Sequence, residues 1–185
     1  MKKKNLLKDK YEKEVVKGMM SEFGTKNRLS VPKINKVVVN MGIKDLHKDK
    51  QLKEQLQLDL ATITGQKPKV QPAKKSIAGF GIRQGMPVGL TVTLRGERMY
   101  SFLAKVITAV LPRLRDFRGV PRKSFDKAGN YTIGFSEHTV FPELDIAKVG
   151  KPHGLEMTIV INSGDPKKSF KMLELLGMPF SKEEI

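Results

Sequence analysis

The sequence feature that most limits the fold is a strict alternation of apolar residues with small or polar ones between positions 88 and 95. The apolar set is Val88, Leu90, Val92 and Leu94, and the set between them is Gly89, Thr91, Thr93 and Arg95. Alternate side chains of a β-strand point to opposite faces, so this segment presents one face to a core and the other to water or a polar ligand. We therefore expect a sheet that is covered on one face only.

Other segments carry helical or strand patterns. Apolar residues at helical spacing predict helices over residues 6–23, 49–64, 97–111 and 166–176. Runs rich in β-branched or alternating apolar residues predict strands over 34–41, 67–70 and 155–161, and a hairpin over 124–135 that turns at 128–130. The segment 73–86 is rich in glycine and alanine and is expected to be a long loop, a kind of segment that is usually functional or disordered.

This order of elements predicts an α+β fold in the form of a two-layer sandwich. We expect a mostly antiparallel sheet with helices on one face and the other face open. The 185 residues are expected to form a single domain, 1–185, with a protruding loop at 74–86 and a basic N-terminal tail at 1–5. No apolar run reaches the roughly 18 residues of a membrane span. The charged residues that follow Leu7 predict that there is no secretion signal.

Positive charge is concentrated in the middle of the chain. The formal net charge is +16, and residues 65–125 hold 13 basic against 2 acidic residues. Residues 126–185 are slightly acidic, with 7 basic and 9 acidic residues. Segregated charge of this size is typical of a surface that contacts nucleic acid. The alternative is a solvated basic face without a partner.

The sequence lacks the residue patterns of common enzymes. It has no cysteine, no GxxxxGK phosphate-binding loop and no His-Glu-x-x-His zinc motif. The histidines are not paired, and His47, His138 and His153 are each expected at the surface or at an interface. We therefore predict no enzyme activity, no cofactor and no metal. The competing classes are an RNA-modifying enzyme, which lacks visible catalytic groups, and a binder of membrane surfaces or other polyanions.

Eight short strings occur in order along the chain and together resemble a known family. They are Val39–Gly42, Thr64–Pro68, Lys75–Phe80, Ile82–Gly85, Thr93–Arg98, Pro112–Gly119, Gly129–Tyr131 and Phe141–Glu143. The chain closely resembles the bacterial-type large-subunit ribosomal protein L5 family over most of its length. Two features depart from the family pattern: the lysines at positions 2–4, and the segment 135–140, which is less basic than expected.

The resemblance implies a non-enzymatic RNA-binding protein with a two-layer α+β fold. Members of this family bind 5S rRNA in the central protuberance of the large subunit, beside 23S rRNA and ribosomal protein L18. A protruding loop contacts the peptidyl-site tRNA, and another surface forms an intersubunit bridge with protein S13 of the small-subunit head. We expect a cytoplasmic location on the ribosome and no membrane partner.

For the 5S rRNA surface, the resemblance implies residues from three segments. They are Asn35, Lys36, Asn40, Met41 and Gly42, then Gln66, Lys67, Pro68 and Lys69, and finally Thr91, Thr93 and Arg95. Such residues suit RNA because amides both donate and accept, Thr and Arg bind phosphate and ribose, and glycine lets the backbone approach closely. The alternatives are turn or edge positions for Asn35 and Asn40, and a surface ion pair with Glu97 for Arg95.

The resemblance also implies a tRNA-facing loop and a bridge surface. The loop residues are Lys74, Lys75, Ser76, Ile77, Ala78, Gly79, Phe80, Gly81 and Arg83. The loop cations are expected to contact phosphate, and Phe80 either stacks on a base or ribose or fills the loop's own small core. The bridge residues are Arg113, Arg115, Arg118, Glu137, His138 and Glu143.

Overall fold

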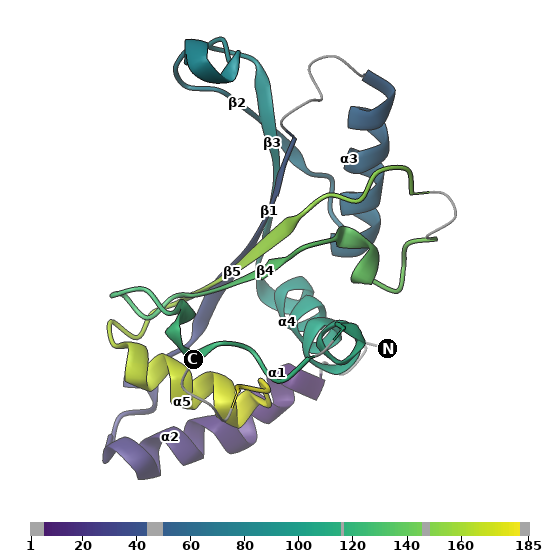
Figure 1. Cartoon of the computed structure of the whole chain (residues 1–185). Helices are drawn as coiled ribbons and strands as arrows, with labels where there is room; N and C mark the ends of the chain where they lie inside the picture. Colours follow the sequence, from purple (N-terminus) through teal and green to yellow (C-terminus); the bar gives the residue numbers. More distant parts are fainter. Residues whose placement is uncertain (1–5, 44–49, 116, 146–148, 182–185) are drawn as a thin grey trace. The chain divides into compact units, whose positions relative to one another are not determined.

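The computed structural model describes residues 6–43, 50–115, 117–145 and 149–181 of the chain (Figure 1). Within these residues, five strands form one sheet in the order β2-β3-β1-β5-β4. The strands are β1 (Ile34–Gly42), β2 (Lys69–Pro72), β3 (Pro87–Leu94), β4 (Tyr131–Phe135) and β5 (Leu155–Ile161). The predicted α+β fold, with an open antiparallel sheet and a layer of helices, is confirmed. The predicted N-terminal tail at 1–5 and His47 lie outside the described residues.

The helices follow the predicted segments. The first begins as α1 (Leu6–Lys10), passes through a π-helical turn and continues as α2 (Val16–Phe23), ending at Gly24 in the left-handed conformation. The others are α3 (Lys50–Thr64), α4 (Gly96–Lys105) and α5 (Pro166–Leu176). After α4 the chain makes a second π-helical turn and then a 3-10 turn that contains Pro112. Asp165 caps α5, because its side chain accepts a hydrogen bond from the backbone N–H of Lys167 at 2.9 Å.

The chain divides into two compact units, and four of the strands, β1, β3, β4 and β5, contribute residues to both. Unit 1 comprises the described residues within Met1–Val37, Leu94–Ile133 and Thr158–Ile185, and unit 2 comprises those within Val38–Thr93 and Gly134–Met157. The prediction of a single domain stays a prediction.

Unit 1 has a helical core. Buried side chains include Val15 and Met19 on the first helix, Leu103 on α4, and Met172 and Leu173 on α5. The hydroxyl of Tyr11 donates a hydrogen bond to the Pro32 carbonyl at 2.7 Å. Burial of the ring raises the pKa of Tyr11 to about 12, so the hydroxyl keeps the proton that it donates.

Unit 2 combines α3 with the paired strands β2 and β3 and most of β1 (Figure 1). The core residues that α3 contributes are Leu56, Leu60 and Ile63, and those of the strands are Val39, Met41, Leu90 and Val92. The residues between them on β1 and β3 are partly exposed. The alternation that the sequence shows in segment 88–95 therefore produces one buried and one accessible face, as predicted.

Two local predictions differ from the structure. The predicted hairpin over 124–135 is only partly formed, because Ser124 belongs to a 3-10 turn and the first arm makes a single antiparallel bridge, between Phe125 and Tyr131. Phe125 packs instead in an aromatic cluster, with its ring centroid 4.5 Å from that of Tyr131. The predicted extended segment 67–70 is strand only from Lys69 onward.

Candidate nucleic-acid interface

The accessible face of β1, β2 and β3 in unit 2 carries several of the predicted RNA-contacting side chains. The Thr91 hydroxyl donates a hydrogen bond to the Asn40 side-chain oxygen at 2.7 Å, which joins β3 to β1. Lys69 pairs with Thr91 in the antiparallel register of β2 and β3, so their side chains lie on the same face. Because the Asn40 oxygen accepts from Thr91, the amide nitrogen of Asn40 is the group that can donate to a ligand. We call the face formed by Asn40, Lys69, Gln71, Thr91 and Thr93 the polar face.

The segment after α3 borders the polar face. Gly65 ends the helix with a φ of 67°. The Gln66 side-chain amide then donates to the backbone carbonyl of Thr93 at 3.3 Å, which attaches this segment to β3. Lys67 is exposed next to it. Pro68 is buried, so it can support this part of the surface but cannot contact RNA with its side chain.

The residues predicted on β1 do not all point the same way. Burial alternates along β1 from Lys36 onward, so Lys36, Asn40 and Gly42 share the accessible face and Met41 lies on the buried one, whereas Asn35 is exposed at the start of the strand before this alternation. Met41 is 1% exposed, so its side chain belongs to the core and only its backbone can approach RNA. The alternative of a turn or edge position for Asn35 and Asn40 is wrong, because both lie on β1, which has a neighbouring strand on each side.

Asn35, Lys36 and Arg95 belong to unit 1, and the other predicted 5S rRNA residues belong to unit 2. Asn35 and Arg95 are exposed and Lys36 is half-buried. Arg95 immediately precedes α4 and has an extended backbone. The residues that the structure brings onto one described surface are therefore those of the polar face and Gln66.

The loop between β2 and β3 is held in shape by its own hydrogen bonds. Ala73 and Met86 are joined at its base by an N–H···O bond of 2.7 Å, and Ile77 and Ile82 form an antiparallel bridge closer to its tip. The Ser76 hydroxyl accepts from the backbone N–H of Gln84 at 2.9 Å. Gly81 makes the turn between the bridged residues with a φ of 64°. The long loop predicted here is thus an ordered extension of the β2–β3 hairpin (Figure 1).

The side chains of this loop are accessible. Lys74, Lys75 and Arg83 are exposed, and Phe80 is 67% exposed. The alternative that Phe80 fills a small core of the loop is therefore wrong. An exposed ring among three cations can stack on a base while the cations contact phosphate.

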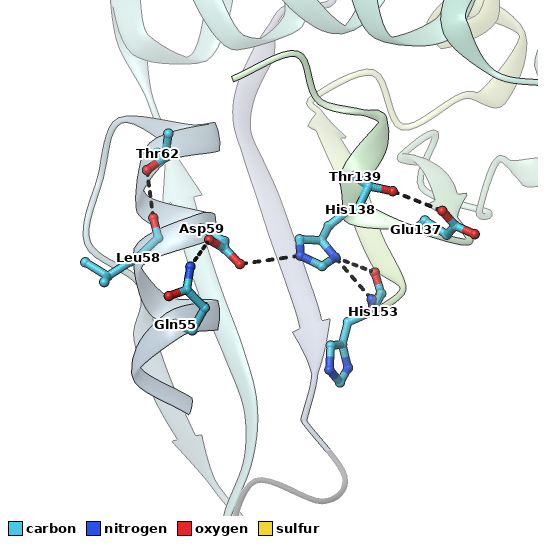
Figure 2. A network of polar contacts seen from close by, with 8 residues as sticks. All are labelled: Gln55, Leu58, Asp59, Thr62, Glu137, His138, Thr139 and His153. Carbon is cyan, nitrogen blue, oxygen red and sulfur yellow. Dashed lines mark hydrogen bonds and ion pairs between the residues drawn. The ribbon is translucent and has the colours of Figure 1, made fainter. Parts of the chain in front are cut away.

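A buried polar network joins α3 to His138 and His153 (Figure 2). Nδ1 of His138 lies 3.1 Å from the backbone nitrogen of His153 and 3.2 Å from the carbonyl oxygen of the same residue, so the other ring nitrogen, Nε2, faces α3. That nitrogen lies 3.5 Å from a carboxylate oxygen of Asp59, and the Gln55 side chain donates to the other oxygen at 2.8 Å. His138 is fully buried and Asp59 is 5% exposed, so the pair fixes the residues around His138 against the helix.

Comparisons with known proteins decide the family. Residues 27–83 match the family described as "Ribosomal protein L5", and residues 87–180 match the C-terminus of the same ribosomal family. The "Large ribosomal subunit protein uL5" of Halothermothrix orenii is 50% identical over 177 residues, which cover 96% of this chain and 99% of that protein. The chain belongs to the ribosomal protein L5 family. The protein of the same name from Dictyoglomus turgidum is 51% identical over 177 residues, with the same two coverages.

Membership in the L5 family makes this chain a structural constituent of the large ribosomal subunit, with a role in translation. The prediction that it is not an enzyme is confirmed by the family. Its partners therefore include rRNA and other parts of the ribosome, and its location is the ribosome of the cytoplasm. Across the described ranges, no helix is long and apolar enough to span a membrane, and no three His, Asp or Glu side chains are grouped to hold a metal ion.

The bridge residues predicted for this L5-family chain fall into two groups. Arg113, Arg115 and Arg118 are exposed in unit 1, and Glu137 and Glu143 are exposed in unit 2. His138 does not belong with them. Its complete burial contradicts both the expected surface position and a direct contact with another protein. As part of the buried network with Asp59, His138 can instead hold the adjacent Glu137 and its neighbours in position.

Two features of the L5-family chain were missed by sequence reasoning. Gln71 lies on the polar face opposite Gly89, and its position two residues after Lys69 in a strand would have indicated this. Asp59 comes directly before Leu60 of the apolar stripe on α3 and is buried like it. A carboxylate on the apolar side of a predicted helix is a signal that a buried partner exists.

Proposed function

We propose that this L5-family protein binds 5S rRNA in the central protuberance through the polar face, together with Gly42, Gln66 and Lys67, and that Asn35, Lys36 and Arg95 of unit 1 make separate contacts with the same RNA. The observation that carries the proposal is the Thr91–Asn40 hydrogen bond, which holds two polar side chains in a fixed arrangement on an accessible sheet. Fixed amide and hydroxyl groups recognise ribose and base edges, and the neighbouring lysines supply phosphate contacts. By resemblance, 23S rRNA and protein L18 are neighbouring partners.

The deciding experiment is a titration of the protein with 5S rRNA in the presence of bulk tRNA, at two salt concentrations. Binding that is tight, survives the competitor and persists at the higher salt supports a specific 5S rRNA site. Binding that disappears with salt and shows no preference for 5S rRNA contradicts the proposal, because a generic basic surface behaves in that way.

Two threonine variants test the arrangement itself. Thr91→Val keeps the shape of the side chain but removes the hydroxyl that orients Asn40, and we expect the affinity for 5S rRNA to fall by about 1–2 kcal/mol. Thr158→Val is the matched control, because Thr158 also forms a cross-strand hydroxyl contact, with Thr132 at 3.1 Å, but lies in unit 1. Equal losses in the two variants would mean that the effect is on strand pairing rather than on recognition.

We also propose that the loop 74–86 contacts the peptidyl-site tRNA through its exposed cations and Phe80. Arg95→Ala should weaken 5S rRNA binding by about 1–3 kcal/mol if Arg95 contacts a defined site. Lys75→Ala should leave that binding nearly unchanged and should weaken binding of tRNA instead. An equal loss of 5S rRNA affinity in both variants would contradict the assignment of two separate RNA surfaces.

A third contact, the intersubunit bridge with protein S13, is proposed for Arg113, Arg115, Arg118, Glu137 and Glu143. His138 enters this proposal only as a positioning residue for the segment that carries the two glutamates. A charge reversal at Glu143 should weaken association of the two ribosomal subunits. The control is a charge reversal at Glu156, an exposed acid on β5 outside the proposed bridge, measured in the same subunit association assay.

A further inference from the structure

We propose that unit 1 carries a second RNA-binding site, which takes an unpaired nucleotide of single-stranded RNA. The site is a pocket of about 410 Å³ lined by Arg122, Lys123, Phe125, Pro166, Lys167 and Phe170. This volume falls within the usual range of small-ligand pockets. The pocket contains none of the residues of the polar face, the loop 74–86 or the bridge, so the proposal extends beyond the proposed function.

The walls of the pocket combine aromatic rings with a planar cation. Phe125 and Phe170 are only half-buried, although both belong to the aromatic cluster that includes Phe180. The ring centroids of Phe170 and Phe180 are 4.6 Å apart, so the cluster holds the exposed rings in place. Half-exposed rings held from behind are the type of surface on which an unpaired base stacks.

Arg122 is fixed in position over one of these rings. Its guanidinium carbon lies 5.2 Å from the centroid of the Phe170 ring. Its Nε donates to the backbone carbonyl of Ser181 at 3.0 Å. With Nε engaged in this way, the two terminal nitrogens of Arg122 are the ones that can bind phosphate or a base edge.

The nearest acids along the chain are engaged in hydrogen bonds of the backbone turns. The Asp126 carboxylate accepts from the side-chain amide of Asn130 at 2.7 Å and from its backbone N–H at 2.8 Å. These hydrogen bonds, the side-chain one above all, hold the pKa of Asp126 below its usual value. Asp165 is engaged as the cap of α5. The pocket is lined by three cations, Arg122, Lys123 and Lys167, and by no acidic residue.

This combination favours RNA over an acidic peptide. Both ligands would neutralise the three cations, but only a nucleotide also has a flat base that gains from an aromatic ring and a guanidinium plane. One pocket of this size holds one nucleotide, with its phosphate at the rim formed by Lys123 and Lys167. The remainder of the strand would lie outside the pocket in solvent.

The test measures binding of a short fluorescent oligoadenylate to the full chain, alongside an abasic oligonucleotide of the same length. All proteins carry Phe80→Leu, which removes the exposed ring of the loop 74–86 as another stacking site. We expect Phe170→Leu to weaken oligoadenylate binding about 10-fold while leaving the abasic strand unchanged, because stacking requires the base. Lys167→Gln should lower the slope of log affinity against log salt by about 0.7, the value for one phosphate of a single strand.

Lys17→Gln is the matched control, because Lys17 is exposed on α2 of the same unit and does not line the pocket. It should change neither quantity. Binding of 5S rRNA, measured in parallel, should be retained in the pocket variants, so that failure of this site and failure of the polar face are distinguishable. Thermal unfolding shows whether the Phe170→Leu variant folds. If that variant does not fold, the Lys167→Gln variant still tests the proposal, because Lys167 is exposed.

Three results would overturn the proposal. The first is equal binding of oligoadenylate and the abasic strand by the parent chain. The second is an effect of Lys167→Gln no larger than that of Lys17→Gln, which would indicate general attraction of polyanions. The third is displacement of the oligoadenylate by polyglutamate at equal charge concentration, which would identify the site as one for acidic peptides.

Discussion

The polar face and the loop 74–86 lie in the same unit and carry similar residues, but they are built differently. On the polar face the side chains project from paired strands, and Asn40 and Thr91 hold each other by a hydrogen bond. In the loop the backbone hydrogen bonds set the shape, and Lys74, Lys75 and Arg83 extend into solvent. The comparison indicates that the face suits a ligand with a fixed pattern of polar groups, whereas the loop suits one that is recognised by its charge.

The largest expected difference between the two regions is in stability. Leu90 lies directly beneath the polar face and is 0% exposed, whereas Ile77 in the loop is 48% exposed. We expect Leu90→Ala to lower the free energy of unfolding by about 3 kcal/mol, because it leaves a cavity in the core. Ile77→Ala should cost less than about 1 kcal/mol. Urea unfolding of both variants measures this, and similar losses would mean that the loop packs as part of the core.

The Asp59–His138 network provides a second way to compare the two regions, because among the described residues no such buried polar pair supports the loop 74–86. Asp59→Ala removes the carboxylate that faces the buried His138 imidazole, and we expect it to lower the free energy of unfolding by about 2–3 kcal/mol. Glu54→Ala, an exposed position on the same helix, should change it by less than about 0.5 kcal/mol. A small effect of Asp59→Ala would mean that the pair contributes little to holding the residues around His138 against α3.

Salt dependence distinguishes how the two regions bind RNA. Each of the changes Lys74→Gln, Lys75→Gln and Arg83→Gln should lower the slope of log affinity for tRNA against log salt by up to about 0.9, as expected when one phosphate contact is lost. Thr91→Val should weaken 5S rRNA binding without altering its slope. Filter binding over a range of salt concentrations gives both values. A changed slope in Thr91→Val would mean that the polar face also acts mainly through charge.

The smallest expected effect concerns the backbone of the loop. Gly81 has a φ of 64°, a region that residues with a Cβ rarely adopt, so Gly81→Ala should strain the turn by about 1 kcal/mol. Gly79 in the same turn has no positive φ and has open space around it, so Gly79→Ala is the control. Trypsin should cleave Gly81→Ala within the loop about 5-fold faster than the control. Equal rates would show that Gly81 does not determine the shape of the loop.

Much of the fold could be predicted because it depends on local patterns. The alternation of apolar residues in β3 specifies a strand, the stripe of leucines on α3 specifies a helix, and the proline at the start of α5 marks where a helix begins. Each of these patterns lies within the element that it specifies. The two accessible threonines on β3 could be predicted for the same reason. The family resemblance supplied the rest of the predicted RNA-contacting residues.

What could not be predicted depends on contacts between distant parts of the chain. The sequence predicts His138 at the surface or at an interface, and only its pairing with Asp59 explains its burial. Phe125 has the pattern of a strand residue, but it packs among rings from elsewhere in unit 1, including Phe170 and Phe180. Met41 is expected at the RNA together with its neighbours on β1, yet the strand turns its side chain to the core.

The Asp59–His138 pair also bears on the order in which the chain can fold. Asp59 lies on α3, and His138 follows only after β2, β3, α4 and β4 in the chain. A growing chain that ends before His138 therefore carries α3 without its imidazole partner, and the residues around His138 can pack against the helix only after they have been synthesised. Contacts between such distant positions form late because a long loop must first close. The segment that carries Glu137 and Glu143 is thus expected to be among the last parts of unit 2 to reach its final structure.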